Sequence, residues 1–109
     1  MSNLEYHVLL ALANGALHGY AIKDAVTAES GGTLTPLPAT LYRVVARLMT
    51  EGLVREVEPA GTQPPHPGLP RRYYGLTAAG RQGLAAEARR LKDAAWLAEA
   101  RLGTTESRP

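Results

Sequence analysis

Apolar residues recur along the first half of the chain at the spacing of amphipathic helices, in three segments. Residues 4–13 are apolar nearly all round, which is typical of a helix buried at the centre of a small domain. The second segment ends near Glu29, and residues 33–35 beyond it are long enough only for a short strand or an extended link. The third segment, residues 38–51, has one continuous apolar side. That side is formed by Leu41, Val44, Val45 and Leu48.

The second half of the chain predicts a hairpin and one long helix. Residues 53–58 and 71–76 have the residue types of strands. Between them, five prolines and two glycines exclude a helix over 59–70 and predict a long hairpin loop. Thr77 is a suitable N-cap for a last helix that runs to about Leu102. The sequence therefore predicts a mainly α protein with a small β-hairpin.

The predicted elements follow the order helix, helix, short strand, helix, hairpin, helix. This is the order of a winged helix-turn-helix, whose third helix enters the major groove of DNA. We expect a winged-helix DNA-binding domain over residues 1–76 and a C-terminal dimerisation helix over 77–102. Residues 103–109 are expected to form a disordered tail.

The side of the third helix opposite its apolar side is small, polar and basic. It is formed by Ala39, Arg43, Ala46, Arg47 and Thr50. Arg43 and Arg47 lie one turn apart, so both guanidinium groups point the same way. A helix fits the major groove, about 12 Å wide, when its outer side carries short side chains and a few long hydrogen-bond donors. The alternative is that the two arginines are only the solvated side of an amphipathic helix.

Composition narrows the class of protein. With 45% hydrophobic and 20% charged residues, the chain is too apolar for a disordered segment and too often charged for a membrane-spanning helix. The absence of cysteine excludes disulfides and thiol catalysis. The N-terminus has no features of a secretory signal, so we expect a cytoplasmic protein. The net charge is +2, but residues 43–109 carry eleven basic and seven acidic side chains, which indicates an anionic partner.

Neither a metal site nor a catalytic site is predicted. His7, His18 and His66 fall on separate elements, without the spacing of two metal ligands on one helix. The chain has no glycine-rich phosphate loop, no nucleophile elbow and no close pair of carboxylates on an apolar background. We therefore expect no cofactor, no metal and no enzymatic activity.

Four segments, in order along the chain, carry a resemblance to a known family. They are Leu4–Leu12, His18–Ile22, Ala39–Val54 and Arg71–Gly80. In these segments the chain resembles the PadR-like transcriptional regulators, and the similarity extends to about Leu102. The resemblance implies a homodimeric winged-helix repressor that binds double-stranded DNA.

The resemblance also implies roles for individual residues. The third helix docks on DNA through the part that carries Thr40, Tyr42, Arg43 and Arg47. The predicted hairpin is the wing of such a domain, and Arg71 and Arg72 at its base hold phosphates. The last helix dimerises, and some members of the family release DNA when a small planar compound binds.

This chain departs from the family pattern in two places. Leu37 stands where the family usually has a capping Ser or Asn, which removes a contribution of about 1 kcal/mol to the helix start. Pro38 partly compensates, because proline suits the first helical position. The last helix is short compared with the longer C-terminal domains of some members of the family, which indicates the compact type.

The last helix has the pattern of a dimer contact. Two rows of apolar residues repeat every seven positions along it, the spacing of two helices packed lengthwise. The rows are Leu84, Leu91 and Ala98, and Ala88, Ala95 and Leu102. The alternative is packing within the chain, but a projecting helix would leave its apolar side in water. Trp96 lies just off the rows, and three placements are open for it. It contacts the partner, it lines a cavity for an aromatic effector together with Leu91, or it stays partly exposed.

Three tyrosines have alternative placements. Tyr42 lies at the edge of the apolar side of the third helix, where its hydroxyl contacts a phosphate or its ring packs beside the hairpin. Tyr73 and Tyr74 point to opposite sides of their strand, and alternation with Leu76 places Tyr74 in the core. Tyr73 then faces DNA or solvent.

These patterns predict a homodimeric, sequence-specific DNA-binding regulator. We expect it to repress transcription from a pseudo-palindromic operator and to be a candidate for release by a small aromatic effector. The alternative is a winged-helix module that binds another protein and does not bind DNA.

Overall fold

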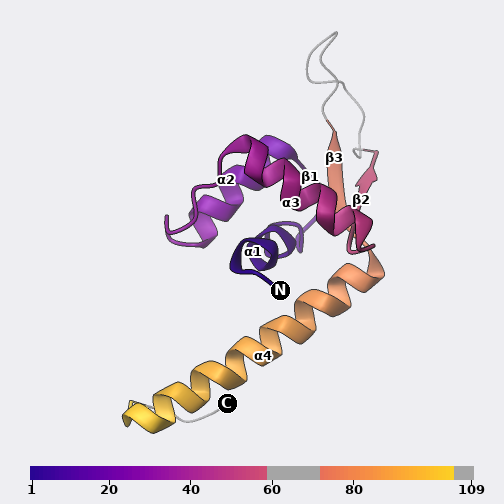
Figure 1. The fold of residues 1–109 in the computed structure, drawn as a ribbon. Helices are drawn as coiled ribbons and strands as arrows, with labels where there is room; N and C mark the ends of the chain where they lie inside the picture. The colour runs from indigo at the N-terminus through magenta and orange to yellow at the C-terminus, as the bar shows by residue number, and fades with distance from the viewer. Residues whose placement is uncertain (59–71, 105–109) are drawn as a thin grey trace.

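The computed structural model describes residues 1–58 and 72–104, which form four helices and three short strands (Figure 1). The elements are α1 (Asn3–Ala11), β1 (Leu17–His18), α2 (Gly19–Glu29), α3 (Pro38–Thr50), β2 (Val54–Val57), β3 (Tyr73–Leu76) and α4 (Ala78–Leu102). The helices and the hairpin strands therefore lie close to where the sequence predicts them. The predicted hairpin loop and residues 105–109 of the predicted tail lie outside the described residues.

Side-chain caps fix the start of α1 and α4 but not of α3. In α1, the Ser2 hydroxyl accepts a hydrogen bond from the Glu5 N–H at 3.1 Å, and the Glu5 carboxylate accepts one from the Ser2 N–H at 2.7 Å. The Thr77 hydroxyl caps α4 by accepting a backbone N–H of the first turn at 2.9 Å. The start of α3 has no side-chain cap, because Leu37 has no polar atom on its side chain, and Pro38 takes the first position. The start of α3 therefore depends on packing.

The three strands form one antiparallel sheet in the order β1-β3-β2. Of the two structures expected for residues 33–35, the short strand is wrong, since these residues form a link between α2 and α3. The short strand is β1, in which Leu17 pairs with Tyr74 and His18 pairs with Tyr73. A strand of two residues is too short to show a periodic pattern in the sequence. Only its pairing with β3 therefore identifies β1 as a strand.

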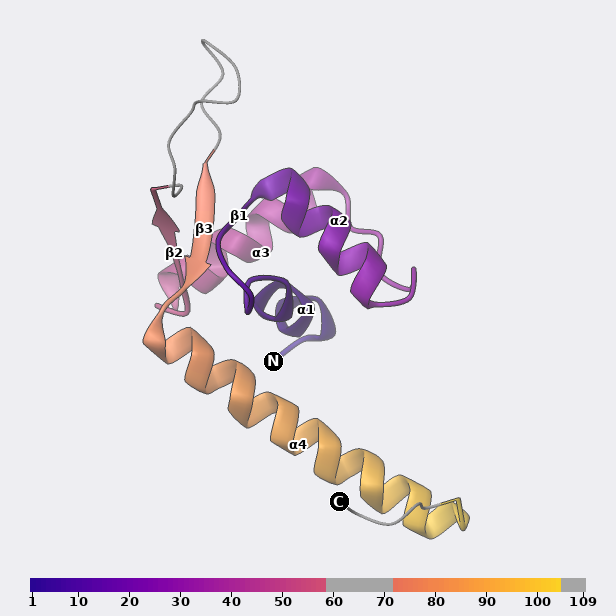
Figure 2. The same cartoon turned by 180° about the vertical axis from the view of Figure 1, so that it is seen from behind.

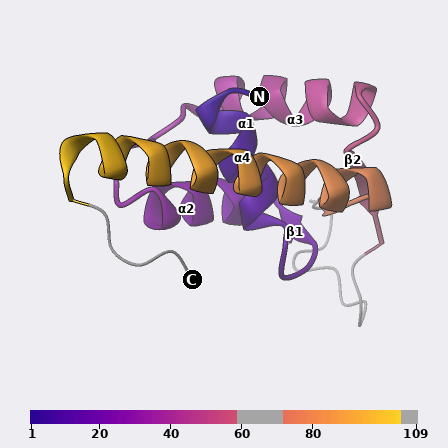
Figure 3. The ribbon, with the colours of Figure 1, turned by 90° about the horizontal axis from the view of Figure 1, so that it is seen from below.

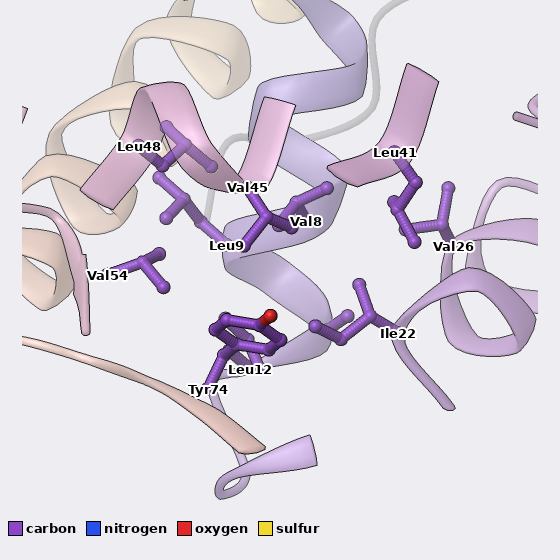
Figure 4. Close-up of a cluster of buried hydrophobic side chains, with 11 residues drawn as sticks. Val8, Leu9, Leu12, Ile22, Val26, Leu41, Val45, Leu48, Val54 and Tyr74 are labelled. Carbon is purple, nitrogen blue, oxygen red and sulfur yellow. The ribbon is translucent and has the colours of Figure 1, made fainter. Parts of the chain in front are cut away.

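The hydrophobic core lies around α1, where side chains of α1, α2, α3 and the hairpin strands meet (Figure 4). Its largest members come from α1 and its C-cap, from α2, from α3 and from the two hairpin strands. They are Val8, Leu9, Leu12, Ile22, Val26, Leu41, Val45, Leu48, Val54 and Tyr74. Burial of each large apolar side chain contributes about 1.5–3 kcal/mol. The apolar side predicted for the third helix is thus in the core, and this fixes the opposite side of α3 toward solvent.

The first turn of α4 is attached to the turn that follows α3. The Thr77 N–H donates to the Leu53 carbonyl at 3.1 Å, and the Thr77 hydroxyl donates to the Gly52 carbonyl at 2.6 Å. Gly80 is buried against the same Leu53 carbonyl, with no room for a side chain. One turn later, Leu84 packs on the core. These contacts set the direction in which α4 leaves the domain.

Beyond its first turns, α4 crosses α1 and extends away from the sheet (Figures 2 and 3). Its 25 residues span about 37 Å at 1.5 Å per residue. No helix within residues 1–58 and 72–104 combines the length and the apolar character needed to cross a membrane.

Candidate nucleic-acid interface

The outer side of α3 is a narrow surface with one long basic side chain at its centre. Ala39, Arg43, Ala46 and Thr50 are all exposed, as the helical spacing predicts. The Thr50 hydroxyl donates to the Ala46 carbonyl at 3.1 Å, which holds it close to the helix. In the described part of the chain, the Arg43 guanidinium forms no ion pair. Arg43 is therefore available to an external acceptor, and the short side chains of Ala39 and Ala46 on the same side of the helix do not obstruct it.

Arg47 differs from Arg43, although both are exposed. Its Nε lies 3.5 Å from Oε2 of Glu5 in α1 and 3.8 Å from Oε1 of Glu51 at the end of its own helix. The side chain is still 72% exposed, so its guanidinium is accessible from outside. The sequence offered one signal for this arrangement, the i,i+4 spacing of Arg47 and Glu51. The contact with Glu5 joins two helices and has no local signal.

Tyr42 packs on the beginning of α2. A Cβ at Gly19 would lie 2.5 Å from the Tyr42 hydroxyl oxygen, so the ring covers the first residue of that helix. The His18 Nδ1 caps the same helix end by accepting the Ala21 N–H at 3.2 Å. Tyr42 keeps 49% of its surface exposed. The phosphate contact expected for its hydroxyl stays a prediction, and the contact with α2 was not anticipated.

Two residues of α2 extend this surface and were missed in the sequence. Tyr20 is exposed next to Gly19, and the Lys23 Nζ lies 5.5 Å from the centre of the Tyr20 ring. A cation over an aromatic face is attracted to it, which holds the two side chains together. Their one-turn spacing is a weak signal, because the same pattern is common on solvated helices.

At the hairpin, Arg72 is exposed and lies beside Glu56 of the neighbouring strand. The Arg72 Nε is 3.7 Å from the Glu56 Oε1. Arg71, the second basic residue predicted at the base of the wing, lies outside the described residues. The alternation prediction is confirmed, since Tyr74 is buried and Tyr73 is half-buried with its ring edge-on to His18. Burial, reinforced by the charge of Glu56, raises the pKa of Tyr74.

Along α4, the residues predicted for the dimer contact differ in exposure. Leu84 and Ala88 are half-buried, and Leu84 packs against the core of its own chain. Leu91, Ala95, Ala98 and Leu102 are exposed, and Trp96 is half-buried. Leu97 is also exposed, although it is not in the seven-residue rows. The outer half of α4 thus leaves an apolar side uncovered within one chain.

The sequence matches a family model and one curated relative. The model described as the transcriptional regulator PadR-like family matches residues 8–86. An uncharacterized 37.1 kDa protein in transposon TN4556 of Streptomyces fradiae is 46% identical over 81 residues, or 74% of this chain. This chain spans only 21% of that relative's length.

Several solved structures share the fold. Bacillus subtilis PadR in complex with operator DNA matches with 27% identity and a TM-score of 0.65, over 80% of this chain and 47% of that one. A PadR-like transcription factor from Bacteroides fragilis matches with 26% identity and a TM-score of 0.68, over 89% and 87% of the two chains. A PadR family regulator from Clostridium difficile has a TM-score of 0.74 at 18% identity, over 93% and 99%. These similarities confirm the winged-helix prediction.

Proposed function

Since this chain belongs to the PadR-like family of transcriptional regulators, we propose that it binds double-stranded DNA in a sequence-specific manner and regulates transcription. PadR-like proteins are transcription regulators and not enzymes. The observation that carries the proposal is the outer side of α3, where Arg43 is exposed beside the short side chains of Ala39 and Ala46 and forms no ion pair within residues 1–58 and 72–104. Bacillus subtilis PadR, with 27% identity, has been solved with its operator, which supports the same partner for this chain.

In the proposed complex, α3 lies in the major groove. A helix about 10–12 Å across fits a groove about 12 Å wide. Arg43 then forms a bidentate contact with guanine O6 and N7, while Ala39 and Ala46 allow close approach. Thr40 and Tyr42 flank this contact and are proposed to bind phosphates, which hold the helix in register.

Titration of labelled DNA at several salt concentrations tests the proposal. The probes are a duplex from the region upstream of the chain's own gene and a random duplex of equal length. Binding should weaken linearly on a log-log plot against salt, because phosphate contacts release counterions, and the upstream duplex should bind more tightly. A winged helix that binds only another protein would show no salt-dependent affinity for either duplex.

The proposed wing contact is tested by Arg72→Ala. Arg72 has an exposed charge next to the hairpin, so we expect it to bind a phosphate. The substitution should weaken binding to all duplexes and lower the log-log salt slope by about one for each protomer bound. Arg101→Ala removes the same charge at the far end of α4 and should leave the slope unchanged. If Arg72→Ala also leaves the slope unchanged, the wing is not a contact.

We also propose that the protein is a homodimer and a repressor. Pairing through α4 would cover the exposed apolar residues of its outer half, from Leu91 to Leu102. Leu84 adds less to this contact, because it already packs in its own chain. Two copies of α3 about 34–36 Å apart would match successive major grooves, so the operator would be a pseudo-palindrome. A dimer on such a site would block transcription where the site overlaps a promoter.

The dimer is tested by Leu91→Glu. A carboxylate at this exposed apolar position would be buried without a partner in the contact, so we expect monomers by light scattering. Ala86→Glu is the matched control, because Ala86 is exposed, lies about 140° around α4 from Leu91 and is nearly three turns from Trp96, so it should tolerate a charge. A dimer that persists in Leu91→Glu would show that this side of α4 is not the interface.

An aromatic effector is proposed to bind beside Trp96. Trp96 and Leu91 are five positions apart, or about 140° around the helix, so one molecule would contact both only across the dimer. Stacking on the indole ring would favour planar compounds. Such a ligand would release DNA by changing how the two α4 helices pack.

A further inference from the structure

Glu5 is a charged residue in a buried position, at the edge between α1 and α3. Only 8% of the residue is exposed. Its Oε1 accepts the Ser2 N–H at 2.7 Å, so the capping box fixes the direction of the side chain. Its Oε2 is the oxygen that lies 3.5 Å from the Arg47 Nε. One carboxylate therefore caps α1 and contacts an arginine of the candidate DNA-binding helix.

Arg47 has a second carboxylate on the same nitrogen. The Glu51 Oε1 is 3.8 Å from the Arg47 Nε. Glu5, Arg47 and Glu51 line an open recess of about 270 Å³ together with Met1, Leu48 and Leu53. Because both carboxylates approach Nε, the two terminal amino groups of the guanidinium are left for an external acceptor. The carboxylates thus contact Arg47 at its Nε, and the terminal amino groups of the guanidinium are accessible to solvent.

The two carboxylates offset the positive charge that Arg47 would otherwise offer to DNA of any sequence. The hydrogen bond from the Ser2 N–H holds the pKa of Glu5 below its usual value, and the charge of Arg47 acts in the same direction against the effect of burial. The Glu5 carboxylate is therefore ionised at neutral pH. The N-terminal amino group also lowers the pKa of Glu5, and the formal charges of Glu5, Arg47, Glu51 and this amino group sum to about zero. Arg43, one turn away, has no such partner in the described residues.

We propose that Glu5 is a positioning residue for Arg47, directing it to a backbone phosphate beside the groove while limiting its attraction to DNA of unrelated sequence. The inference rests on the proposed function and deepens it. The two arginines of α3 then have different tasks. Arg43 contacts a base, and Arg47 contributes only when the helix is seated so that a phosphate meets its free edge. The Glu5 carboxylate thereby raises the ratio of specific to unspecific affinity.

Glu5→Gln tests this in a double-mutant cycle with Arg47→Ala. Glutamine keeps the size of the side chain and the oxygen that caps α1, so thermal unfolding should be nearly unchanged. Affinity for a random duplex should rise about threefold to tenfold at low salt, and the log-log salt slope should steepen. Affinity for the preferred duplex should change less. In the Arg47→Ala background, Glu5→Gln should change the random-duplex affinity by less than about twofold.

Two further variants complete the design. Glu29→Gln makes the same change in net charge at an exposed position on α2 and should leave both affinities within about twofold. Glu51→Gln removes the other carboxylate and should also raise the affinity for a random duplex. This variant keeps the test available if Glu5→Gln does not fold.

The outcomes separate this inference from the function on which it rests. Equal effects of Glu5→Gln with and without Arg47, or an unchanged ratio of affinities, overturn the positioning role while DNA binding stands. A wild-type protein without salt-dependent affinity for any duplex overturns both.

Discussion

Replacing Gly80 with alanine should destabilise the protein by about 3 kcal/mol, although alanine is the better helix former by nearly 1 kcal/mol. A Cβ at Gly80 would overlap the Leu53 carbonyl oxygen, which also accepts the Thr77 N–H at 3.1 Å. Backbone atoms cannot move aside as a side-chain end can, so the first turn of α4 would have to separate from the turn after α3. Urea unfolding followed by circular dichroism measures the loss.

Gly83→Ala is the matched control for this prediction. A Cβ at Gly83 would lie 3.8 Å from a Leu53 methyl carbon, which is an ordinary contact. The substitution should therefore be neutral or stabilise the helix by up to about 1 kcal/mol. Equal stability of the two variants would contradict the close approach of α4 to Leu53.

Arg43→Ala should have the largest effect on DNA recognition. A bidentate contact between arginine and guanine contributes about 1–3 kcal/mol of discrimination against other bases. We therefore expect affinity for the preferred duplex to fall about tenfold to a hundredfold for each half-site, with a much smaller loss for a random duplex. Paired titrations at one salt concentration measure both. Equal losses on the two duplexes would make Arg43 a phosphate contact.

Arg43→Lys separates charge from geometry in the same assay. Lysine keeps the positive charge but lacks the planar fork that matches the two guanine acceptors. Affinity for random DNA should be retained, and the preference for the selected duplex should fall. Retained preference would show that charge alone is sufficient at this position.

The parts of the fold that the sequence predicted are those with a local signal. The apolar side of α3 repeats over about two turns, from Leu41 to Leu48, so its orientation follows from spacing alone. Thr77 as the cap of α4 is likewise a property of adjacent residues. In contrast, β1 is two residues long and is defined by its pairing with Tyr73 and Tyr74. No pattern within the chain segment identifies such a strand.

The same distinction between local sequence signals and contacts between separate elements applies to the candidate site. Exposure of Arg43 and Arg47 could be predicted, because it depends on the position of each residue around one helix. The contact of Arg47 with Glu5 and that of Tyr42 with Gly19 could not, because each joins residues of two different helices, more than 20 positions apart in the sequence. The seven-residue rows on α4 have a similar ambiguity, since an apolar position such as Leu84 serves the core of its own chain as well as a partner.

Protection of guanine N7 from methylation tests the central claim most directly, because N7 faces the major groove. The duplex would be one selected by this protein from a random pool. We predict protected guanines in two groups about one helical turn apart, and loss of protection at one guanine of each group with Arg43→Ala. Guanines that stay fully reactive at saturating protein would contradict the placement of α3 in the major groove.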